Sequence, residues 1–521
     1  MNVAELLEKQ AKLRPEKIAI IETGNSGENY ISYGELQNAV LKVSGFLTKQ
    51  AFKKGEAILI FQPMSIILYV YLLACFRLGI IAMFIDPGMG RRYIEQCCSI
   101  FPPKGFLATP KAHLYRIISK PIRKIPFKFT TGCWVPGAIR AFTIPENDIN
   151  ESSIEGGDEI ALLTFTSGST GKPKAAARSH NFLLAQNRVL SRNLNLVENQ
   201  RDFTSFPIFV LANLAAGLTT IIPSGNLRKP AAIDGDELLK QIDSYNPDRL
   251  SIPPSMLKRL LESCENQGRK IDSGISIYTG GSPVFPNLLK KIDRVACKSD
   301  IVVVYGSTEA EPIAELRYSQ IREQDFVAMS RGKGLLAGNV INDVQLKIIS
   351  SEDGVPLGNL TQDKFLQLTL PSATAGEIVV TGNHVLKGYL QGIGDKETKF
   401  SVEGNIWHRT GDAGYLDDEN RLWLLGRHKK IINDEFGVAY PFSIECAAMQ
   451  YAGVQYAAFV CWENQRVLVL EVTKEFKEEA LTLFKLETNI SKIVTIKSLP
   501  LDKRHNGKVD YPALMKWLNK Q

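Results

Sequence analysis

Disulfide frameworks and metal-ligating clusters are absent from this sequence. Its eight cysteines are scattered through apolar contexts without C-x-x-C spacing, and its six histidines form no cluster with them. These absences argue against a secreted disulfide-rich scaffold and against a zinc site, and they indicate reduced thiols and a cytoplasmic protein. The first residues, Met1 to Glu5, lack the basic start and apolar core of a secretory signal.

Long hydrophobic runs are absent as well. The longest apolar stretch holds thirteen residues, from Met64 to Phe76, whereas a helix needs about 20 residues to span a bilayer. We therefore expect this stretch to form a buried core helix. With 521 residues, 44% of them hydrophobic, the chain is long enough to bury more than one core.

Acidic residues are missing from one interval, 96–145, between Glu95 and Glu146, although the net charge of the whole chain is only +7. Two interpretations stay open for this interval: a solvated basic face, or a surface for peripheral attachment to an anionic membrane or an acidic partner. No recognition motif for nucleic acid accompanies the charge, so we expect no such partner. The basic residues are Lys104, Lys111, Arg116, Lys120, Arg123, Lys124, Lys128 and Arg140.

The hydrophobic periodicity predicts an α/β fold. Ser32 and Glu35 form a capping box, and apolar residues follow at helical spacing over 36–47. Strands at 57–61 and 80–84 flank a helix at 65–77, which makes a βαβ unit and requires a parallel sheet. Because this pattern repeats, we expect stacked, mainly parallel sheets with helices up to about residue 330, and then a small β subdomain at about 338–427 with antiparallel strands.

Residues 161–177 run from an apolar strand into a loop suited to a polyphosphate. The loop offers hydroxyl groups, two lysines, and glycines that let backbone N–H groups approach anionic oxygens. It is not a Walker A loop, because the spacing is too short and no Ser or Thr follows Lys172. A solvated turn after a buried strand is the alternative. The candidate phosphate-binding residues are Thr166, Ser167, Gly168, Ser169, Thr170, Gly171, Lys172 and Lys174.

This loop resembles the phosphate loop of the adenylate-forming superfamily, and three further motifs follow in that family's order. They are Tyr305–Ala310, the stretch from Thr410-Gly411-Asp412 to Gly426-Arg427, and Asn506-Gly507-Lys508. A narrower resemblance, to OleC-like fatty acid ligase or β-lactone synthetase proteins, rests on 84–90, 278–284 and 334–338. The resemblance implies an adenylation domain at 1–428 and a smaller, mobile α+β domain at 429–521.

The resemblance also implies ATP and Mg²⁺ as cofactors and assigns the nucleotide site. Tyr305 would stack on adenine, Thr308 would contact the α-phosphate, and Glu309 would bind Mg²⁺. Asp412 would hold the ribose with help from Arg427. Structural roles are the alternatives, because Tyr305 could fill a pocket and Glu309 could cap a turn. The remaining nucleotide contacts implied are Gly281, Ser282, Pro283, Gly306 and Ser307.

Lys508 is the strongest catalytic candidate, because a lysine ammonium is a compact charge for the pentavalent phosphate intermediate. Its alternative is an ordinary surface lysine. Lys429 aligns with the family's hinge residue. The loop at 433–441 departs from the family's pattern, since Gly437 is displaced by one position and the expected Arg is missing, which puts transfer to CoA in doubt.

Small and apolar residues follow Pro207 and form either an acyl pocket or close-packed core. The candidates for that pocket are Phe209, Val210, Leu211 and Ala212. We expect ATP-dependent adenylation of a fatty or other apolar carboxylic acid with release of pyrophosphate, then transfer to CoA. The alternatives are an OleC-like β-lactone synthetase acting on a β-hydroxy fatty acid and a non-catalytic adenylate-binding protein. Chain length and oligomeric state stay open.

Overall fold

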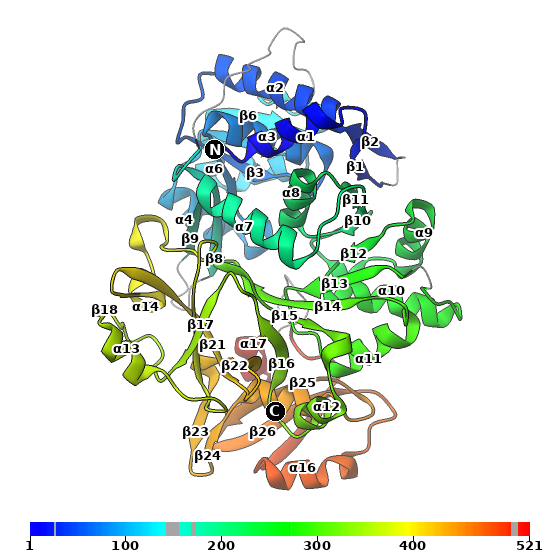
Figure 1. Cartoon of the computed structure of the whole chain (residues 1–521), viewed down its shortest axis with the longest axis vertical. Helices are drawn as coiled ribbons and strands as arrows, with labels where there is room; N and C mark the ends of the chain where they lie inside the picture. The colour runs from blue at the N-terminus through cyan, green and yellow to red at the C-terminus, as the bar shows by residue number, and fades with distance from the viewer. Residues whose placement is uncertain (25–27, 142–155, 168–172, 272–273, 502–508, 521) are drawn as a thin grey trace. The chain divides into compact units, whose positions relative to one another are not determined.

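The computed structural model describes residues 1–24, 28–141, 156–167, 173–271, 274–501 and 509–520. The chain divides into two compact units (Figure 1). Unit 1 contains 1–227, 240–251 and 383–395, and unit 2 contains 228–239, 252–382 and 396–521. The expected domain boundary at 428/429 stays a prediction.

Unit 1 contains a seven-stranded sheet in the order β7-β6-β5-β3-β4-β8-β9. Every described pairing in it is parallel except that of β8 with β9, and β3 and β4 form the predicted βαβ unit around α3. The strands are β3 (Ala57–Phe61), β4 (Ile81–Phe84), β5 (Gly105–Ala108), β6 (Phe127–Thr130), β7 (Ile139–Arg140), β8 (Ile160–Ser167) and β9 (Pro173–Ser179).

A second group of strands in unit 1 runs β12-β10-β11-β1-β2, parallel except for β1 with β2. These strands are β1 (Ile18–Glu22), β2 (Asn29–Ser32), β10 (Arg201–Thr204), β11 (Thr219–Ile222) and β12 (Arg249–Ser251). The helices of unit 1 are α1 (Ala4–Leu13), α2 (Tyr33–Lys49), α3 (Ile66–Leu78), α4 (Arg91–Ile100), α5 (Tyr115–Ile118), α6 (Lys120–Lys124), α7 (His180–Asn193) and α8 (Pro207–Ala216), with short 3₁₀ turns η1 (Pro87–Met89), η2 (Ala112–Leu114) and η5 (Leu390–Gly392).

Two of the helices in unit 1 confirm local sequence predictions. The Ser32 hydroxyl accepts a hydrogen bond from the Glu35 amide, and the Glu35 carboxylate accepts one from the Ser32 amide, so the capping box begins α2 as expected. α3 is the predicted core helix, and the left-handed residue Gly79 ends it. Over the described residues, no helix is both long enough and apolar enough to cross a membrane.

In unit 2, β13 and β14 are parallel, and the sheet continues with antiparallel strands in the order β15-β16-β22-β21-β19-β17. The strands predicted at 344–349, 377–381 and 421–425 are present as β17, β19 and β22, whereas β15, β16 and β21 were not anticipated from the sequence. The strands are β13 (Ser276–Gly280), β14 (Ile301–Ser307), β15 (Ala310–Arg317), β16 (Leu335–Val340), β17 (Gln345–Ile349), β18 (Asn359–Leu360), β19 (Gly376–Thr381), β20 (Lys399–Val402), β21 (Asn405–Leu416) and β22 (Arg421–Arg427).

The chain after β22 forms its own core. Strands β25, β26 and β27 make a sheet that packs against α15 on one face and α17 on the other. Its elements are η6 (His428–Lys430), β23 (Ile432–Asp434), β24 (Gly437–Ala439), α15 (Pro441–Ala448), β25 (Val454–Trp462), β26 (Gln465–Val472), η7 (Glu478–Leu481), α16 (Thr482–Glu487), β27 (Lys492–Ile496) and α17 (Tyr511–Leu518). The other helices are α9 (Gly235–Tyr245, through which the unit division passes), α10 (Pro254–Asn266), α11 (Pro286–Val295), α12 (Glu323–Ser330), α13 (Gln362–Leu368), α14 (Asp395–Thr398), η3 (Pro230–Ala232) and η4 (Tyr318–Gln320).

Candidate active site

The predicted phosphate loop connects the antiparallel strands β8 and β9. Gly168, Ser169, Thr170, Gly171 and Lys172 lie outside the described residues. The register of the hairpin places Ser167 opposite Pro173 and Thr166 opposite Lys174. Both predicted flanks of the loop are therefore brought side by side at one end of the hairpin.

Lys174 lies largely buried, with 7% of its surface exposed. Its ammonium group is 5.6 Å from the centroid of the Tyr389 ring, and Ala176 on the same strand forms a β-bridge with Tyr389. Gly394 has a φ of +95°, and a Cβ there would come within 2.5 Å of the Lys174 side chain. Segment 389–394 therefore holds the stem of Lys174 in place, a contact that the sequence did not signal.

The motifs of unit 2 that are predicted to bind the nucleotide lie at the ends of two neighbouring parallel strands. Gly281, Ser282 and Pro283 directly follow β13, and Tyr305, Gly306 and Ser307 end β14. A Cβ at Gly280 would lie 2.4 Å from the Val304 carbonyl oxygen, so only glycine permits this close approach. In open α/β sheets, ligands bind beyond the carboxyl ends of the strands.

A charged cluster in unit 2 joins Tyr305 to the Thr-Gly-Asp motif. The Tyr305 hydroxyl donates to Oδ2 of Asp412 at 2.8 Å, and Nε of Arg427 lies 3.3 Å from Oδ1 of Asp412. Arg427 also donates to the Thr410 carbonyl, and the Thr410 hydroxyl accepts from the Asp412 amide. Asp412 and Arg427 are register partners on β21 and β22. The structure thus confirms that these three predicted residues are neighbours.

The protonation behaviour of this cluster follows from its contacts. Burial and the neighbouring Asp412 carboxylate raise the pKa of Tyr305 well above its ordinary value, so the phenol stays a donor. The Asp412 carboxylate is also the main cause of a raised pKa at Arg427, with a smaller contribution from Glu309. A fixed carboxylate flanked by a hydroxyl donor and a guanidinium is suited to accept hydrogen bonds from the two hydroxyls of a ribose.

Thr308 and Glu309 lie at the turn between β14 and β15, and both make polar or electrostatic contacts. Just before them, the buried Ser307 hydroxyl has no hydrogen-bond partner among the described residues. An unsatisfied buried hydroxyl is costly without a ligand, so this corner fits a bound polar group. Among the described residues no group of three or more His, Cys, Asp or Glu side chains could hold a metal by itself. Mg²⁺ commonly takes one or two carboxylates plus phosphate oxygens, which Glu309 and a bound ATP would supply.

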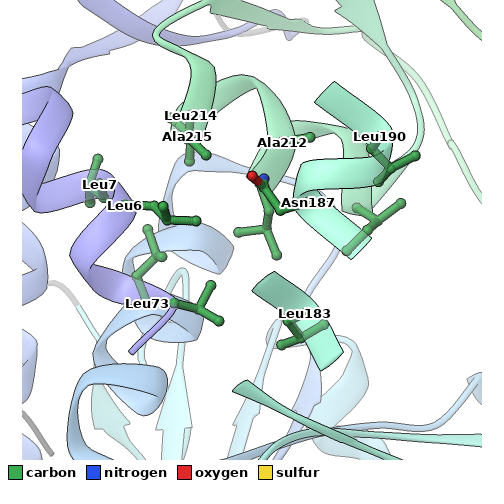
Figure 2. Close-up of a pocket in the computed structure, with 12 residues that line it drawn as sticks. Leu6, Leu7, Leu73, Leu183, Asn187, Leu190, Ala212, Leu214 and Ala215 are labelled. Carbon is green, nitrogen blue, oxygen red and sulfur yellow. The ribbon is translucent and has the colours of Figure 1, made fainter. Parts of the chain in front are cut away.

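Of the four residues predicted to form an acyl pocket, two line a cavity in the described part of unit 1. Leu211 and Ala212 line a small apolar cavity between α1, α3, α7 and α8, with Leu6, Leu73 and Leu183 around the same space (Figure 2). Its volume is about 20 Å³, roughly the space of a single water and too small for a long alkyl chain. Phe209 and Val210 are buried elsewhere, Phe209 against Phe206. The assignment of an acyl pocket stays a prediction.

Lys508 lies outside the described residues, but both ends of its segment are fixed. Leu501 and Val509 form a β-bridge, and Tyr511 begins α17. The Tyr511 hydroxyl donates to Glu445, a carboxylate buried on α15 that sequence reasoning missed. The sequence feature that could have identified Glu445 is that it is the single acid in the otherwise uncharged helix Pro441–Ala448.

The predicted hinge residue Lys429 is exposed and lies in the turn η6 that follows β22. It borders a cavity of about 180 Å³ together with Lys430 and Tyr511. The Lys430 ammonium lies 4.8 Å from the centroid of the Tyr511 ring, so the presumed hinge and the chain after Lys508 meet at one place in unit 2.

The loop at 433–441, whose sequence departs from the family's pattern, contains the hairpin β23–β24. Asp434 makes a bidentate ion pair with Arg466 of β26, with N–O distances of 2.7 and 2.8 Å. Arg466 also donates a hydrogen bond to the Gly437 carbonyl. Hydrogen bonding to Arg466 lowers the pKa of Asp434. Arg466 therefore supports the hairpin from inside, whereas Phe436 and Val438 are exposed on it.

Comparisons with known proteins identify relatives that span nearly the whole chain. The chain is 25% identical over 561 aligned positions to an olefin β-lactone synthetase from Stenotrophomonas maltophilia, with 99% of this chain and 98% of that protein covered. It is 26% identical to an indoleacetate–CoA ligase from Aromatoleum aromaticum, with 85% and 82% covered.

Among solved structures, the amide bond synthetase McbA from Marinactinospora thermotolerans matches with a TM-score of 0.80 at 18% identity, covering 99% of both chains. O-succinylbenzoate coenzyme A synthetase (MenE) from Bacillus subtilis, in complex with ATP and a magnesium ion, matches with a TM-score of 0.75 at 22% identity, covering 96% of this chain and 97% of that one. These two likenesses concern the fold. The family model for AMP-binding enzymes matches residues 7–390. This chain belongs to the AMP-binding enzyme family and is an acid-activating ligase of the adenylate-forming type.

Proposed function

We propose that this ligase activates a β-hydroxy carboxylic acid with a long apolar substituent as its acyl adenylate and then closes the adenylate to a β-lactone. The first half is supported by the cluster of Tyr305, Asp412 and Arg427. The observation that carries the second half is the hairpin β23–β24, which has two acids, Asp434 and Glu435, and no basic residue. The near-complete coverage of an olefin β-lactone synthetase supports the same choice.

In the first half-reaction, a carboxylate oxygen of the acid attacks the α-phosphorus of ATP and pyrophosphate leaves. Asp412 and Arg427 would fix the ribose, and Thr166 and Lys174 would border the phosphates. Mg²⁺, held by Glu309 and phosphate oxygens, would neutralise charge on the triphosphate. Lys508 would place its ammonium where negative charge increases between the attacking and leaving oxygens.

In the second half-reaction, the β-hydroxyl oxygen attacks the acyl carbon, AMP leaves with the bonding electron pair, and the hydroxyl proton is released. A well-oriented intramolecular nucleophile has an effective concentration on the order of 10⁵ M or above, so a diffusing thiol competes only where a site binds it. In this chain the Arg466 guanidinium beside the hairpin is already paired with Asp434. It would not be available for the phosphates of CoA.

Transfer to CoA is the second candidate. It is favoured by the similarity to CoA ligases such as that from Aromatoleum aromaticum. Lys429 and Lys430 border the 180 Å³ cavity, which Ile432 of the hairpin also lines, and a CoA phosphate could contact these two lysines. This alternative retains the same adenylation site and differs only in the acceptor.

The test compares two matched substrates, a β-hydroxy fatty acid and the same acid without the hydroxyl, each with ATP and Mg²⁺ and with or without CoA. We expect the hydroxy acid to give lactone and AMP at a rate that CoA does not change. The plain acid should give one equivalent of pyrophosphate per enzyme and then stop at the bound adenylate. Acyl-CoA as the main product from both acids would reject lactone formation. Absence of pyrophosphate release from either acid would reject apolar acid activation itself.

A further inference from the structure

The interval 96–145 places exposed apolar side chains on one small surface of unit 1. Leu114, Ile117 and Ile118 follow the i, i+3, i+4 spacing of one helical face across η2 and α5, and they are 58%, 67% and 50% exposed. Trp134, on the segment that joins β6 to β7, is 68% exposed, and Ile139, the first residue of β7, is 39% exposed. Large apolar side chains on a soluble surface are normally scattered, so five of them within 26 residues need a reason.

Hydrogen bonds hold together the two segments that carry these side chains. The Arg116 guanidinium donates to the Pro136 carbonyl at 2.9 Å, and a Cβ at Gly137 would lie 3.3 Å from the same guanidinium. Arg123 donates to the carbonyls of Arg116 and Ile117, which fixes α6 against α5. The segments that carry the exposed apolar residues are therefore neighbours, and we call their exposed side chains together the 111–140 surface.

The charged residues that the interval 111–140 itself contributes are all basic. Lys111, Lys120, Arg123, Lys124 and Arg140 are exposed around the apolar residues, and the sequence has no acid between Glu95 and Glu146. The preceding acid in the sequence, Glu95 on α4, lies beside Ser119 of this surface, and its charge is paired with that of Arg91. A basic rim around exposed aliphatic residues and a tryptophan is the pattern of a protein surface that lies in a bilayer interface.

We infer that the 111–140 surface docks this protein on an anionic membrane, with Ile117 and Trp134 inserted at the headgroup level and the lysines facing acidic lipid headgroups. A solvated basic face does not require exposed Leu114, Ile117, Ile118 and Trp134. An acidic protein partner would account for the basic residues alone. An anionic membrane accounts for both the basic residues and the exposed apolar residues. This inference does not depend on the acid that the enzyme activates.

The experiment is sedimentation of the full chain with vesicles of phosphatidylcholine alone or with 30% phosphatidylglycerol, at low and high salt. We expect binding to the anionic vesicles only, strongest at low salt, because each basic residue near an anionic surface contributes a separately screened attraction. Three neutralised lysines, K111Q/K120Q/K124Q, should weaken binding about 100-fold at low salt. The matched control K240Q/K270Q/K298Q removes the same charge from exposed lysines elsewhere and should bind as the wild type does.

The contribution of the apolar side chains to membrane binding is tested by the double variant I117S/W134S. The control is L13S/L486S, because Leu13 and Leu486 lie outside this surface and are 62% and 69% exposed. We expect the first pair to lose vesicle binding and the control to retain it, with pyrophosphate release unchanged in both. Wild-type binding by either surface variant would overturn the proposal. So would failure of the wild type to sediment at low salt, or binding to polyglutamate without binding to vesicles, which would indicate an acidic protein partner.

Discussion

Glu445 makes the stability of the core formed by α15, β25 and α17 depend on pH. The carboxylate is buried on α15, accepts from the Phe459 amide at 2.9 Å and from the Tyr511 hydroxyl, and its burial raises its pKa from 4.5 to about 7. That rise corresponds to about 3 kcal/mol in favour of the protonated carboxyl. Because the folded state binds the proton more tightly, this stabilisation is fully present below pH 4.5 and is lost as the pH rises toward 7.

The substitution Glu445→Gln keeps an acceptor oxygen but removes the titration. Integrated from pH 5.5 to pH 8, the wild type should lose about 2 kcal/mol relative to the variant. Cys446, the next residue, is buried, so its alkylation requires opening of α15. Measured by mass spectrometry of that peptide, the ratio of wild-type to variant labelling rates should rise about 30-fold between these two pH values. The exposed control Glu475→Gln should show a constant ratio. A ratio for Glu445→Gln that does not change with pH would refute a pKa near 7.

Three further outcomes test the active site. Lys508→Ala should slow pyrophosphate release about 100-fold or more while ATP still binds, since one preorganised charge donor typically contributes about 3 to 4 kcal/mol; wild-type release would remove Lys508 from the chemistry. Tyr305→Phe should weaken ATP binding about 5-fold in calorimetry, the loss of about 1 kcal/mol for one hydrogen bond to Asp412, and unchanged binding would contradict that role. Gly426→Ala should destabilise the protein by about 1 to 3 kcal/mol more than Gly404→Ala in urea unfolding. A Cβ at Gly426 meets Phe442 at 2.5 Å, whereas the equally left-handed Gly404 faces open space, so equal effects would contradict the clash.

Local chemistry made part of this molecule predictable from its sequence. The capping box of α2, the core helix α3 and the motif residues after β13 and β14 all depend on neighbours within a few positions. The triad of Tyr305, Asp412 and Arg427 could be named as one site only through the resemblance to a family, because Tyr305 and Asp412 are 107 positions apart.

Contacts between residues far apart in the sequence determine the features that local sequence patterns did not predict. The run Ala175-Ala176-Ala177 has a high helix propensity, yet it lies in β9 because each residue pairs with the apolar strand β8. The hairpin β23–β24 lacks an Arg in sequence, but Arg466 reaches it from β26, 32 positions away from Asp434. Glu445 is an acid in a buried helix position, and only Tyr511 and Phe459 in space explain how it is satisfied.

The geometry of the proposed ribose anchor, Asp412 and Arg427, depends on the backbone as well as on the charged residues themselves. Asp412 and Arg427 face each other because β21 and β22 pair antiparallel, with an irregularity at Ala413 and Gly414 that sets their register. Gly411 has a φ of +69° and Gly426 a φ of +108°, and each directly precedes one of the charged partners. Any other residue in place of either glycine would strain the backbone and move the Asp412 carboxylate relative to the Arg427 guanidinium. The glycines of the Thr-Gly-Asp and Gly-Arg motifs therefore help to set the position of the Asp412 carboxylate relative to Arg427, and the Tyr305 hydroxyl at the end of β14 donates a hydrogen bond to the same carboxylate.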